Sequence, residues 1–361
     1  MCNACKTIPS PTDDRVNEVA MRLLTTINEA GLALMISLGH RAGLFDALAA
    51  SPDVRSDQLA KSAGLNERYV REWLGAMVTA DVVLYDPQEQ TYTLDPAYAL
   101  VLPKGAEANM SAMFQFVPVL AGVESELVNV FEHGGGVPYE SFERFHEVMA
   151  EESDNTVVSC LTDQILPLVP GLTEKLTAGI DVLDAGCGSG HALCTLARAF
   201  PNSRFTGFDL CQEAVDAAIT HATAKGLTNI RFESRDLSAM GADAQFDLVT
   251  AFDIVHDQCD PAGVLTNIRN ALRPGATFLM QDIRASSKLE NNLDHPIGPF
   301  LYTISTMHCL TVSLAQGGAG LGTVWGEELA VEMLSDAGFA NISVNQLPHD
   351  IMNNWYVSTR A

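Results

Sequence analysis

The sequence predicts an α/β protein with two parts, a mostly parallel sheet in the C-terminal half and an α-rich domain before it. Apolar strands alternate with amphipathic helices from residue 181 onward, which is typical of a parallel sheet. A glycine-rich turn joins the first of these strands to a helix. The first hundred residues contain two helices at helix-turn-helix spacing and then a hairpin pattern. We expect domains over residues 1–104, 105–170 and 171–361.

Composition narrows the class of protein. The 361 residues, 47% of them apolar, are enough for two hydrophobic cores. The net charge of -24 opposes binding to a polyanion, so we expect no nucleic-acid partner. The first thirty residues lack the apolar core of a signal peptide, and the eight cysteines show no disulfide pattern, so we expect a cytoplasmic protein. Cys2 and Cys5 form a CxxC without a second pair, which predicts no zinc site.

The N-terminal part is expected to form a winged helix. The spacing of apolar residues over 14–45 predicts two or more amphipathic helices. Helices over 56–63 and 66–80 follow, and the alternating segments 82–85 and 91–94 predict a β-hairpin wing. Residues 105–170 are helical and apolar in pattern and are expected to link the domains and cover a site.

The second helix of this motif lacks a basic face. Arg68 and Arg71 are accompanied by Glu67 and Glu72, and Trp73 is expected to be buried. Because DNA binding requires clustered Lys and Arg, we expect the domain to serve dimerisation instead.

The strand 182–185 runs into a turn with glycine at every second position. Gly186, Gly188 and Gly190 permit close approach of a ligand, and Asp184 precedes them. The GxGxG spacing differs from the GxGxxG of dinucleotide sites, and no P-loop Lys follows. An acid beside the turn suits a ligand with a cationic end and ribose hydroxyls, and S-adenosylmethionine (SAM) has both. The strand 205–209 ends in Asp209, in position to accept ribose hydroxyls.

These residues, the Arg235-Asp236-Leu237 step and the strand 246–250 resemble motifs of class I SAM-dependent methyltransferases over roughly the last half of the chain. The resemblance implies a Rossmann-like, seven-stranded sheet in which the three glycines pack under the methionine and ribose. It also implies that Asp209 binds the ribose, that Asp236 receives the adenine amino group and that Leu237 covers the ring. The remaining residues assigned to this cofactor site are Asp184, Cys187, Leu210 and Phe252. A domain that binds NAD or a flavin is the alternative.

His256 is the candidate general base. It follows the strand that ends at Ala251, which puts it at the ligand edge of the sheet. O-methyltransferases have a similar His-Asp-Trp stretch whose histidine is the base, but Gln258 replaces the tryptophan here. Asp282, at the end of the next strand, matches an acid that orients the imidazole. The alternative is a structural histidine in a loop.

The segment 296–326 contains no charged residue and is expected to be buried as a pocket wall or dimer core. Pro299 and the glycines after residue 316 interrupt it, so we expect no membrane span. The candidate acceptor-binding residues are Tyr302, Met307, His308 and Cys309, with plain packing as the alternative. The set of His256, His308, Cys259 and Cys309 lacks tight metal-ligand spacing, so we expect no metal.

The stretches 307–318, 349–351 and 353–356 are similar to a subfamily of winged-helix methyltransferases found in mycobacteria, fungi and nematodes. The similarity runs nearly end to end. Some animal and fungal members are associated with S-methylation of small thiols, which implies a small thiol acceptor here. The alternatives are O-methylation of a small molecule through the histidine base, and a SAM-sensing winged-helix regulator. We expect a homodimer that binds neither membranes nor nucleic acids.

Overall fold

The computed structural model describes residues 12–106, 109–241 and 244–361. The chain divides into two compact units, Met1–Pro118 and Val119–Ala361, which are described separately. The expected division at residues 104 and 170 stays a prediction; residues 119–170 belong to the same compact unit as the sheet. The CxxC of Cys2 and Cys5 lies outside the described residues.

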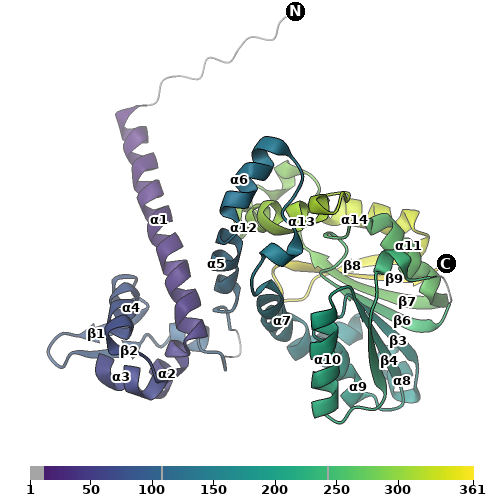
Figure 1. Cartoon of the computed structure of the whole chain (residues 1–361), viewed down its shortest axis with the longest axis horizontal. Coiled ribbons are helices and arrows are strands. Elements are labelled where there is room, and N and C mark those ends of the chain that lie inside the picture. The colour runs from purple at the N-terminus through teal and green to yellow at the C-terminus, as the bar shows by residue number, and fades with distance from the viewer. Residues whose placement is uncertain (1–11, 107–108, 242–243) are drawn as a thin grey trace, which may run out of the picture. The chain divides into compact units, whose positions relative to one another are not determined.

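The N-terminal unit consists of one long helix that is followed along the chain by a winged helix (Figure 1). Its elements are α1 (Asp13–Arg41), α2 (Leu44–Ala50), α3 (Ser56–Ala63), α4 (Glu67–Thr79), β1 (Val83–Asp86) and β2 (Thr91–Leu94). The hairpin β1–β2 is antiparallel, with Val83 opposite Leu94. The predicted helix-turn-helix and wing are confirmed.

The prediction of two or more helices over residues 14–45 is wrong for the stretch before residue 42, which forms a single helix. One helix runs from Asp13 to Arg41, and α2 begins only at Leu44. Thr12 caps α1 by accepting a hydrogen bond from the backbone N–H of Arg15, and acids in the first turn and basic residues in the last suit the helix dipole. The chain from 13 to 41 contains no proline, so nothing forces a break there.

The core of the N-terminal unit forms where the end of α1 meets α2 and α4. The indole Nε1–H of Trp73 donates to the carbonyl of Met35 at 2.8 Å, and Phe45 meets the Trp73 ring edge-on. A Cβ on Gly39 would lie 2.5 Å from the Trp73 ring, so this crossing requires glycine. Trp73 is therefore buried, as predicted.

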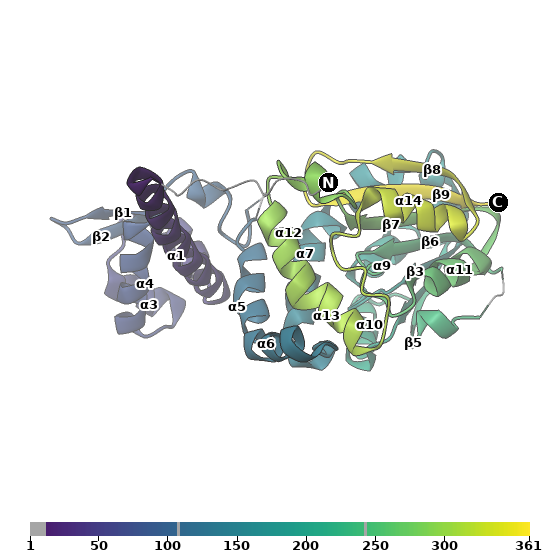
Figure 2. The same cartoon turned by 90° about the horizontal axis from the view of Figure 1, so that it is seen from above.

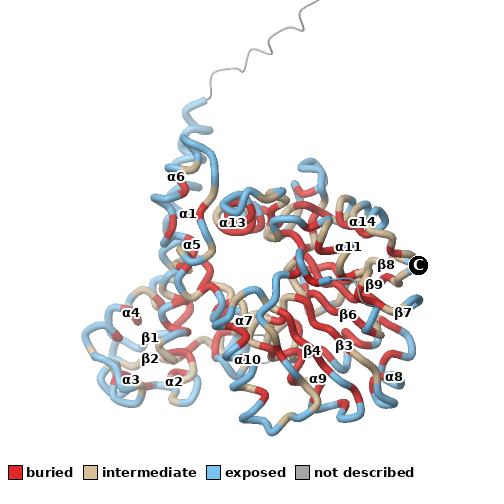
Figure 3. Tube along the Cα trace, turned by 45° about the vertical axis from the view of Figure 1, so that its right-hand side comes forward, coloured by how far each residue is buried: buried red, intermediate tan, exposed pale blue. Residues whose placement is uncertain are grey.

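The first two thirds of α1 are exposed although many of their residues are apolar (Figure 3). The exposed apolar side chains of this surface are Val16, Val19, Met21, Leu23, Leu24 and Ile27. By length and composition alone α1 could cross a membrane, with 6% of its most apolar window buried. Two shorter helical segments, Met113–Ala121 and Glu124–His133, meet that criterion only when taken together.

The C-terminal unit is built on a sheet that, in the described residues, has seven strands in the order β5-β4-β3-β6-β7-β9-β8 (Figure 1). Its first five strands are parallel and β9 and β8 are antiparallel. The strands are β3 (Asp181–Ala185), β4 (Arg204–Asp209), β5 (Ile230–Ser234), β6 (Phe246–Phe252), β7 (Leu272–Ile283), β8 (Phe339–Asn345) and β9 (Asn353–Arg360). The predicted Rossmann-like sheet is confirmed.

Helices cover both faces of this sheet and bury two apolar clusters (Figure 3). One cluster joins the sheet to α8 (Leu172–Ala178), α9 (His191–Ala199) and α10 (Gln212–Ala224). The other joins it to α11 (Pro261–Ala271) and α14 (Gly326–Asp336). The strand order reverses between β3 and β6, so a ligand is expected at their carboxyl ends.

Segments from two distant parts of this unit lie together beside the sheet (Figure 2). They include α6 (Glu124–His133), α7 (Phe145–Thr156), α12 (Gly298–Ile304), the π-helix η9 (Ser305–Cys309) and α13 (Leu310–Ala315). The helix α6 ends at His133, and Gly136 after it packs so closely on α13 that a Cβ would lie 1.9 Å from the carbonyl oxygen of Thr311. The charge-free segment is buried at His308 and Cys309 of η9 and at Thr311, Val312 and Ser313, whereas the first three residues of η9 are half-buried and Leu314 is exposed.

Candidate active site

The turn after β3 requires glycine for two physical reasons. Gly186 and Gly190 have φ of 75° and 74°, in the left-handed region that favours glycine. A Cβ on Gly190 would lie 2.7 Å from the Phe232 ring, and one on Gly186 would lie 2.6 Å from Ile254. The N–H groups of Gly186 and Cys187 both donate to the carbonyl of Phe208. The turn is therefore tied to the end of β4.

Asp209 organises the same turn, as its position at the end of β4 predicts. Its Oδ2 accepts a hydrogen bond from the N–H of Gly188 at 2.8 Å, and its Oδ1 accepts one from the N–H of Cys211 at 2.9 Å. The structure thus brings the two separated sequence motifs together. Ribose binding by this carboxylate stays a prediction.

Asp184 lies beneath the turn, 3% exposed. Its Oδ1 accepts a hydrogen bond from the hydroxyl of Thr250 at 2.6 Å. Burial raises the pKa of Asp184 to about 6 despite that hydrogen bond, and the charge of Asp209 adds to the rise. A cation bound above the turn would relieve this buried negative charge.

The other residues assigned to the cofactor lie at the ends of neighbouring strands. Asp236 is exposed, and its Oδ1 accepts a hydrogen bond from the N–H of Ser238. Leu237 is buried in the α11-side cluster, whereas Leu210 is exposed despite its apolar side chain. Phe252 is half-buried with its ring edge-on to Trp355. Their contacts with adenine or ribose stay predictions.

His256 and Asp282 form a buried, hydrogen-bonded dyad. The Nδ1–H of His256 donates to Oδ1 of Asp282 at 2.8 Å, and the two residues are 4% and 0% exposed. The same oxygen accepts hydrogen bonds from Nε1 of Trp325 at 2.9 Å and from the N–H of Ile283 at 2.8 Å. The predicted pairing of acid and histidine is present. Trp325 was not predicted, because nothing in its local sequence ties it to a residue 43 positions away.

The hydrogen bond to Asp282 affects the pKa of His256. Burial alone would lower the pKa of His256, but the charge of Asp282 and the hydrogen bonds of the ring with Asp282 and Cys309 hold it well above its ordinary value. Since Nδ1 is committed to Asp282, Nε2 is the nitrogen that an acceptor would reach, in competition with the thiol of Cys309. Whether His256 acts in catalysis stays a prediction.

Gln258 stands where similar enzymes have tryptophan. Its Nε2 donates to Oδ1 of Asp257 at 3.1 Å. Burial raises the pKa of Asp257 to about 6, against the opposing charge of His256. The replacement therefore supplies a donor to a second, half-buried acid next to the candidate base.

The candidate acceptor residues divide into two groups. His308 and Cys309 are buried on the π-helix η9, and the thiol of Cys309 lies between Nδ1 of His308, at 3.7 Å, and the ring of His256. Helical distortions of this kind are frequent at functional sites. Met307 is half-buried, and Tyr302 is partly exposed with its hydroxyl accepting a hydrogen bond from Asn292. Only the first group is joined to His256 by the described contacts.

An aromatic cluster surrounds His308. Its ring stacks on Phe145 with centroids 3.5 Å apart and meets Tyr139 and Phe142 edge-on. Burial lowers the pKa of His308 to about 3, so this histidine is neutral at physiological pH. The aromatic residues come from residues 139–145, which the sequence indicates only as part of a covering segment.

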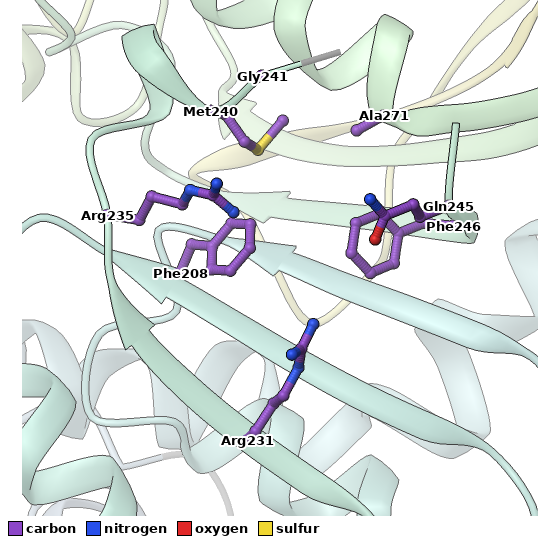
Figure 4. A pocket seen from close by; sticks show the side chains of 8 residues that line it. All are labelled: Phe208, Arg231, Arg235, Met240, Gly241, Gln245, Phe246 and Ala271. Atoms are coloured by element: carbon purple, nitrogen blue, oxygen red, sulfur yellow. The ribbon is translucent and has the colours of Figure 1, made fainter. Parts of the chain in front are cut away.

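A group of possible metal ligands and a cavity are two further features of the C-terminal unit. Asp253, His256 and Asp282 offer three ligand atoms within 4.8 Å of one another, but the short bond of His256 to Asp282 is that of a hydrogen-bonded pair. A cavity of about 140 Å³ lies against β4, β5 and the start of β6, and Figure 4 shows the side chains that line it. It is lined by Phe208, Arg231, Arg235, Met240, Gly241, Gln245, Phe246 and Ala271, none of which is a predicted site residue.

Family models match both parts of the chain. Residues 30–104 match an Rv2258c-like winged HTH domain, and residues 176–320 match a methyltransferase domain. Among curated proteins, the ubiquinone biosynthesis O-methyltransferase of Coxiella burnetii is 31% identical over 127 residues, 35% of this chain and 49% of that protein. The enzyme of the same name from Leptothrix cholodnii is 29% identical over 130 residues, 35% of this chain and 54% of that protein. The chain thus spans about half the length of the curated relatives it matches.

Solved structures match over nearly the whole chain. Human N-acetylserotonin methyltransferase in complex with SAM has a TM-score of 0.68 at 16% identity and covers 98% of this chain and 100% of its own. An O-methyltransferase family protein from Burkholderia thailandensis has a TM-score of 0.66 at 15% identity and covers 95% and 98%. Likeness at this identity shows the fold.

The fold and the glycine turn define the class, a class I methyltransferase fold. The family models add that the chain joins a winged helix-turn-helix domain to a methyltransferase domain. The predicted resemblance is confirmed at this level, and the mycobacterial, fungal and nematode subfamily stays a prediction.

Proposed function

We propose that the chain is a SAM-dependent methyltransferase whose acceptor is a small molecule with a nucleophilic thiol. The methyltransferase-domain match and the glycine turn bonded to Asp209 support SAM as the cofactor. In this proposal Gly186, Gly188 and Gly190 pack under the methionine and ribose and Asp209 binds the ribose. Asp236 and Leu237 contact the adenine. The charge-free segment around His308 and Cys309 contacts the acceptor.

Bound SAM supplies a methyl group on a sulfonium, and the chain's residues position the acceptor in line with it. Positioning can contribute about 7 to 11 kcal/mol to such a displacement. The acceptor proton passes to Nε2 of His256 and then to solvent, and the acceptor electron pair forms the new bond to carbon. The pair of the broken carbon–sulfur bond stays on sulfur, giving S-adenosylhomocysteine.

The observation that carries the thiol assignment is the raised pKa of His256 beside Asp282. A raised pKa makes neutral His256 a stronger base toward the acceptor proton, and the imidazolium that forms pairs with the acceptor anion. Ionising a thiol at pH 7 costs about 2 kcal/mol, whereas ionising a phenol costs about 4 kcal/mol. The pairing of imidazolium with thiolate is therefore the less costly state.

The runner-up is O-methylation of a small molecule. The human structural relative, N-acetylserotonin methyltransferase, and mitomycin 7-O-methyltransferase both share the fold of this chain. On that reading neutral His256 accepts a hydroxyl proton, as a general base contributing about 10² to 10⁴ in rate.

Turnover of matched thiol and hydroxyl acceptors distinguishes S-methylation from O-methylation. Purified protein would be given SAM with 4-methylbenzenethiol or 4-methylphenol, and with an alkanethiol or the corresponding alcohol, and S-adenosylhomocysteine would be measured. Faster turnover of both thiols than of both oxygen analogues supports the proposal, and the reverse order establishes O-methylation. Silence with all acceptors despite SAM binding supports the SAM-sensing regulator.

We also propose a homodimer formed through α1. Its exposed apolar residues need cover, and Glu18, Arg22 and Glu29 along the helix make a lipid span costly. Leu24→Glu is expected to shift the protein to a monomer by light scattering after size exclusion. Leu100→Glu changes another exposed leucine of the same unit, outside α1, and serves as control. A parent protein that is already monomeric, or that partitions into vesicles, contradicts the proposal.

The remaining partner and location proposals rest on charge and thiols. In α4, Arg68 pairs with Glu72 and Arg71 with Glu67, which supports the absence of a nucleic-acid partner. The cysteines in the described ranges are free, which supports a reducing, cytoplasmic location. A shift of a labelled DNA duplex by the protein at physiological salt would contradict the first of these.

A further inference from the structure

Two acids, half-buried Asp253 and buried Asp282, lie close together with too few hydrogen-bond donors between them. An oxygen of each lies within 4.8 Å of the other. Oδ1 of Asp282 accepts three N–H groups, but its Oδ2 is buried without a partner. Oδ2 of Asp253 accepts a hydrogen bond from Gln281 at 3.3 Å, and its Oδ1 is likewise buried without a partner. One oxygen of each acid is thus unpaired.

The backbone at Asp253 is held in an unusual conformation. Its φ is 55°, in the left-handed region that residues other than glycine rarely adopt, although Asp and Asn tolerate it best. The N–H of Asp253 donates to the carbonyl of Gln281 at 3.0 Å, so β7 stabilises the strained residue. Strain of this kind persists where the surroundings over-determine it, and it clusters at functional sites.

A single proton would satisfy both unpaired oxygens. An ionised carboxylate only accepts hydrogen bonds, so two ionised acids side by side repel and leave both oxygens unpaired. The charged groups around Asp253 are Asp282, Asp350 and Asp257, which are negative, and His256. Burial and the charge of Asp282 raise the pKa of Asp253 well above its ordinary value, while His256 opposes the rise. Proton uptake is therefore favoured at this acid.

We propose that Asp253 is a positioning residue for His256. Its carboxyl group keeps one proton and donates it to Oδ2 of Asp282, so that the pair carries a single negative charge and Oδ1 of Asp282 stays directed at His256. The consequence for turnover rests on the proposed function, in which His256 takes the acceptor proton. The consequence for the titration of His256 does not depend on it.

The test is the pKa of His256, measured by NMR titration in the parent protein, Asp253→Asn and Asp253→Gly. Both replacements tolerate a positive φ, and neither carries charge. If Asp253 is already neutral, Asn leaves the pKa of His256 unchanged, and Gly raises it because Asp282 loses a donor. If Asp253 is ionised in the parent, both replacements remove a negative charge and lower the pKa of His256, which overturns the proposal.

Two controls complete the design. Asp260→Asn changes an exposed acid of the same loop that caps α11, and is expected to leave the His256 titration unchanged. Titrating the parent with Zn²⁺ or Mg²⁺ tests whether a cation, rather than a proton, pairs the acids. A saturable shift of the His256 signals that Asp253→Asn abolishes would overturn the proposal.

Turnover gives a second readout if an acceptor is found. Asp253→Asn is expected to keep the parent turnover, whereas Asp253→Gly is expected to lower it about tenfold, as the loss of one hydrogen bond to a charged group predicts. The affinity for SAM should not change in either, and the acid limb of the pH–rate profile should move up in the Gly variant alone. Equal losses in both variants would contradict a shared proton. With no acceptor, the titration alone decides.

Discussion

Oδ1 of Asp282 accepts hydrogen bonds from Nδ1 of His256 at 2.8 Å and from Nε1 of Trp325 at 2.9 Å. A carboxylate that receives donors from two sides is fixed in its plane, so the imidazole bonded to it is fixed as well. The tryptophan thus reaches the candidate base through the acid, without touching the base itself.

Replacing Trp325 by Phe is expected to lower turnover about tenfold, because one hydrogen bond to a charged acceptor is lost. SAM affinity should not change. Trp355→Phe is the matched control, since that indole N–H is buried but has no hydrogen-bond partner. Steady-state kinetics and calorimetry with SAM measure the two effects, and equal turnover losses in the two variants would show that Trp325 only fills space.

Two glycines of the turn are expected to differ in their tolerance of a methyl group. Gly188→Ala adds a Cβ with nothing within 4 Å and carries only the left-handed strain of about 1 to 2 kcal/mol. Gly190→Ala adds the same strain plus contact with Phe232 and Ala218, for which overpacking adds about 1 to 3 kcal/mol. Urea unfolding measures the difference. Equal free energies of unfolding would mean that Phe232 and Ala218 move aside for the added methyl group at no cost in stability.

Asp209→Ala is expected to weaken SAM binding at least about tenfold, because the carboxylate holds the N–H groups of Gly188 and Cys211 and is the proposed ribose acceptor. Asp216→Ala removes an exposed acid of α10 and should leave binding unchanged. Calorimetric titration with SAM gives both dissociation constants. If the two variants bind SAM alike, the cofactor assignment of Asp209 is wrong.

The affinity for SAM is expected to fall as the pH is lowered from about 7 to about 5, because Asp184 and Asp257 each have a pKa raised to about 6. Above that pH both are ionised and attract the sulfonium, and below it they are neutral. S-adenosylhomocysteine lacks the sulfonium and should show a weaker dependence. A SAM affinity that is flat over this range would place the cation away from both acids.

The same two groups make a prediction for folding. Their folded pKa values lie above the unfolded value of 3.8, so the stability that they contribute is full at low pH and is lost as the pH rises through about 6. The free energy of unfolding of the SAM-free protein, from urea titrations at several pH values, should therefore fall between about pH 4 and 6, and saturating SAM should reduce that fall. A fall of the same size with and without SAM would separate the cofactor from these acids.

Much of the C-terminal unit could be predicted because its signals are local. The glycine turn, the acid ending β4 and the alternation of strands and helices each lie within a short stretch. The pairing of His256 with Asp282 was expected from the resemblance to O-methyltransferases, in which an acid after the next strand flanks the base. Trp325, Asp253 and the aromatic residues around His308 could not be predicted, because their partners are set by packing between segments far apart in the sequence.

For the long helix α1, the sequence predicted less of the structure. Its apolar spacing predicted amphipathic helices, and the apolar side chains of the helix are exposed over most of its length. Periodicity reports that a face needs cover but not which molecule supplies it. One continuous helix formed where breaks were expected, because Gly31 alone does not terminate a helix.

The most direct test of the central claim is calorimetric titration of the purified protein with SAM and, separately, with NAD⁺. The turn bonded to Asp209 predicts saturable binding of one SAM per chain, lost in Asp209→Ala, and no saturable binding of NAD⁺. Binding of NAD⁺ without binding of SAM would contradict the account and favour a dinucleotide site.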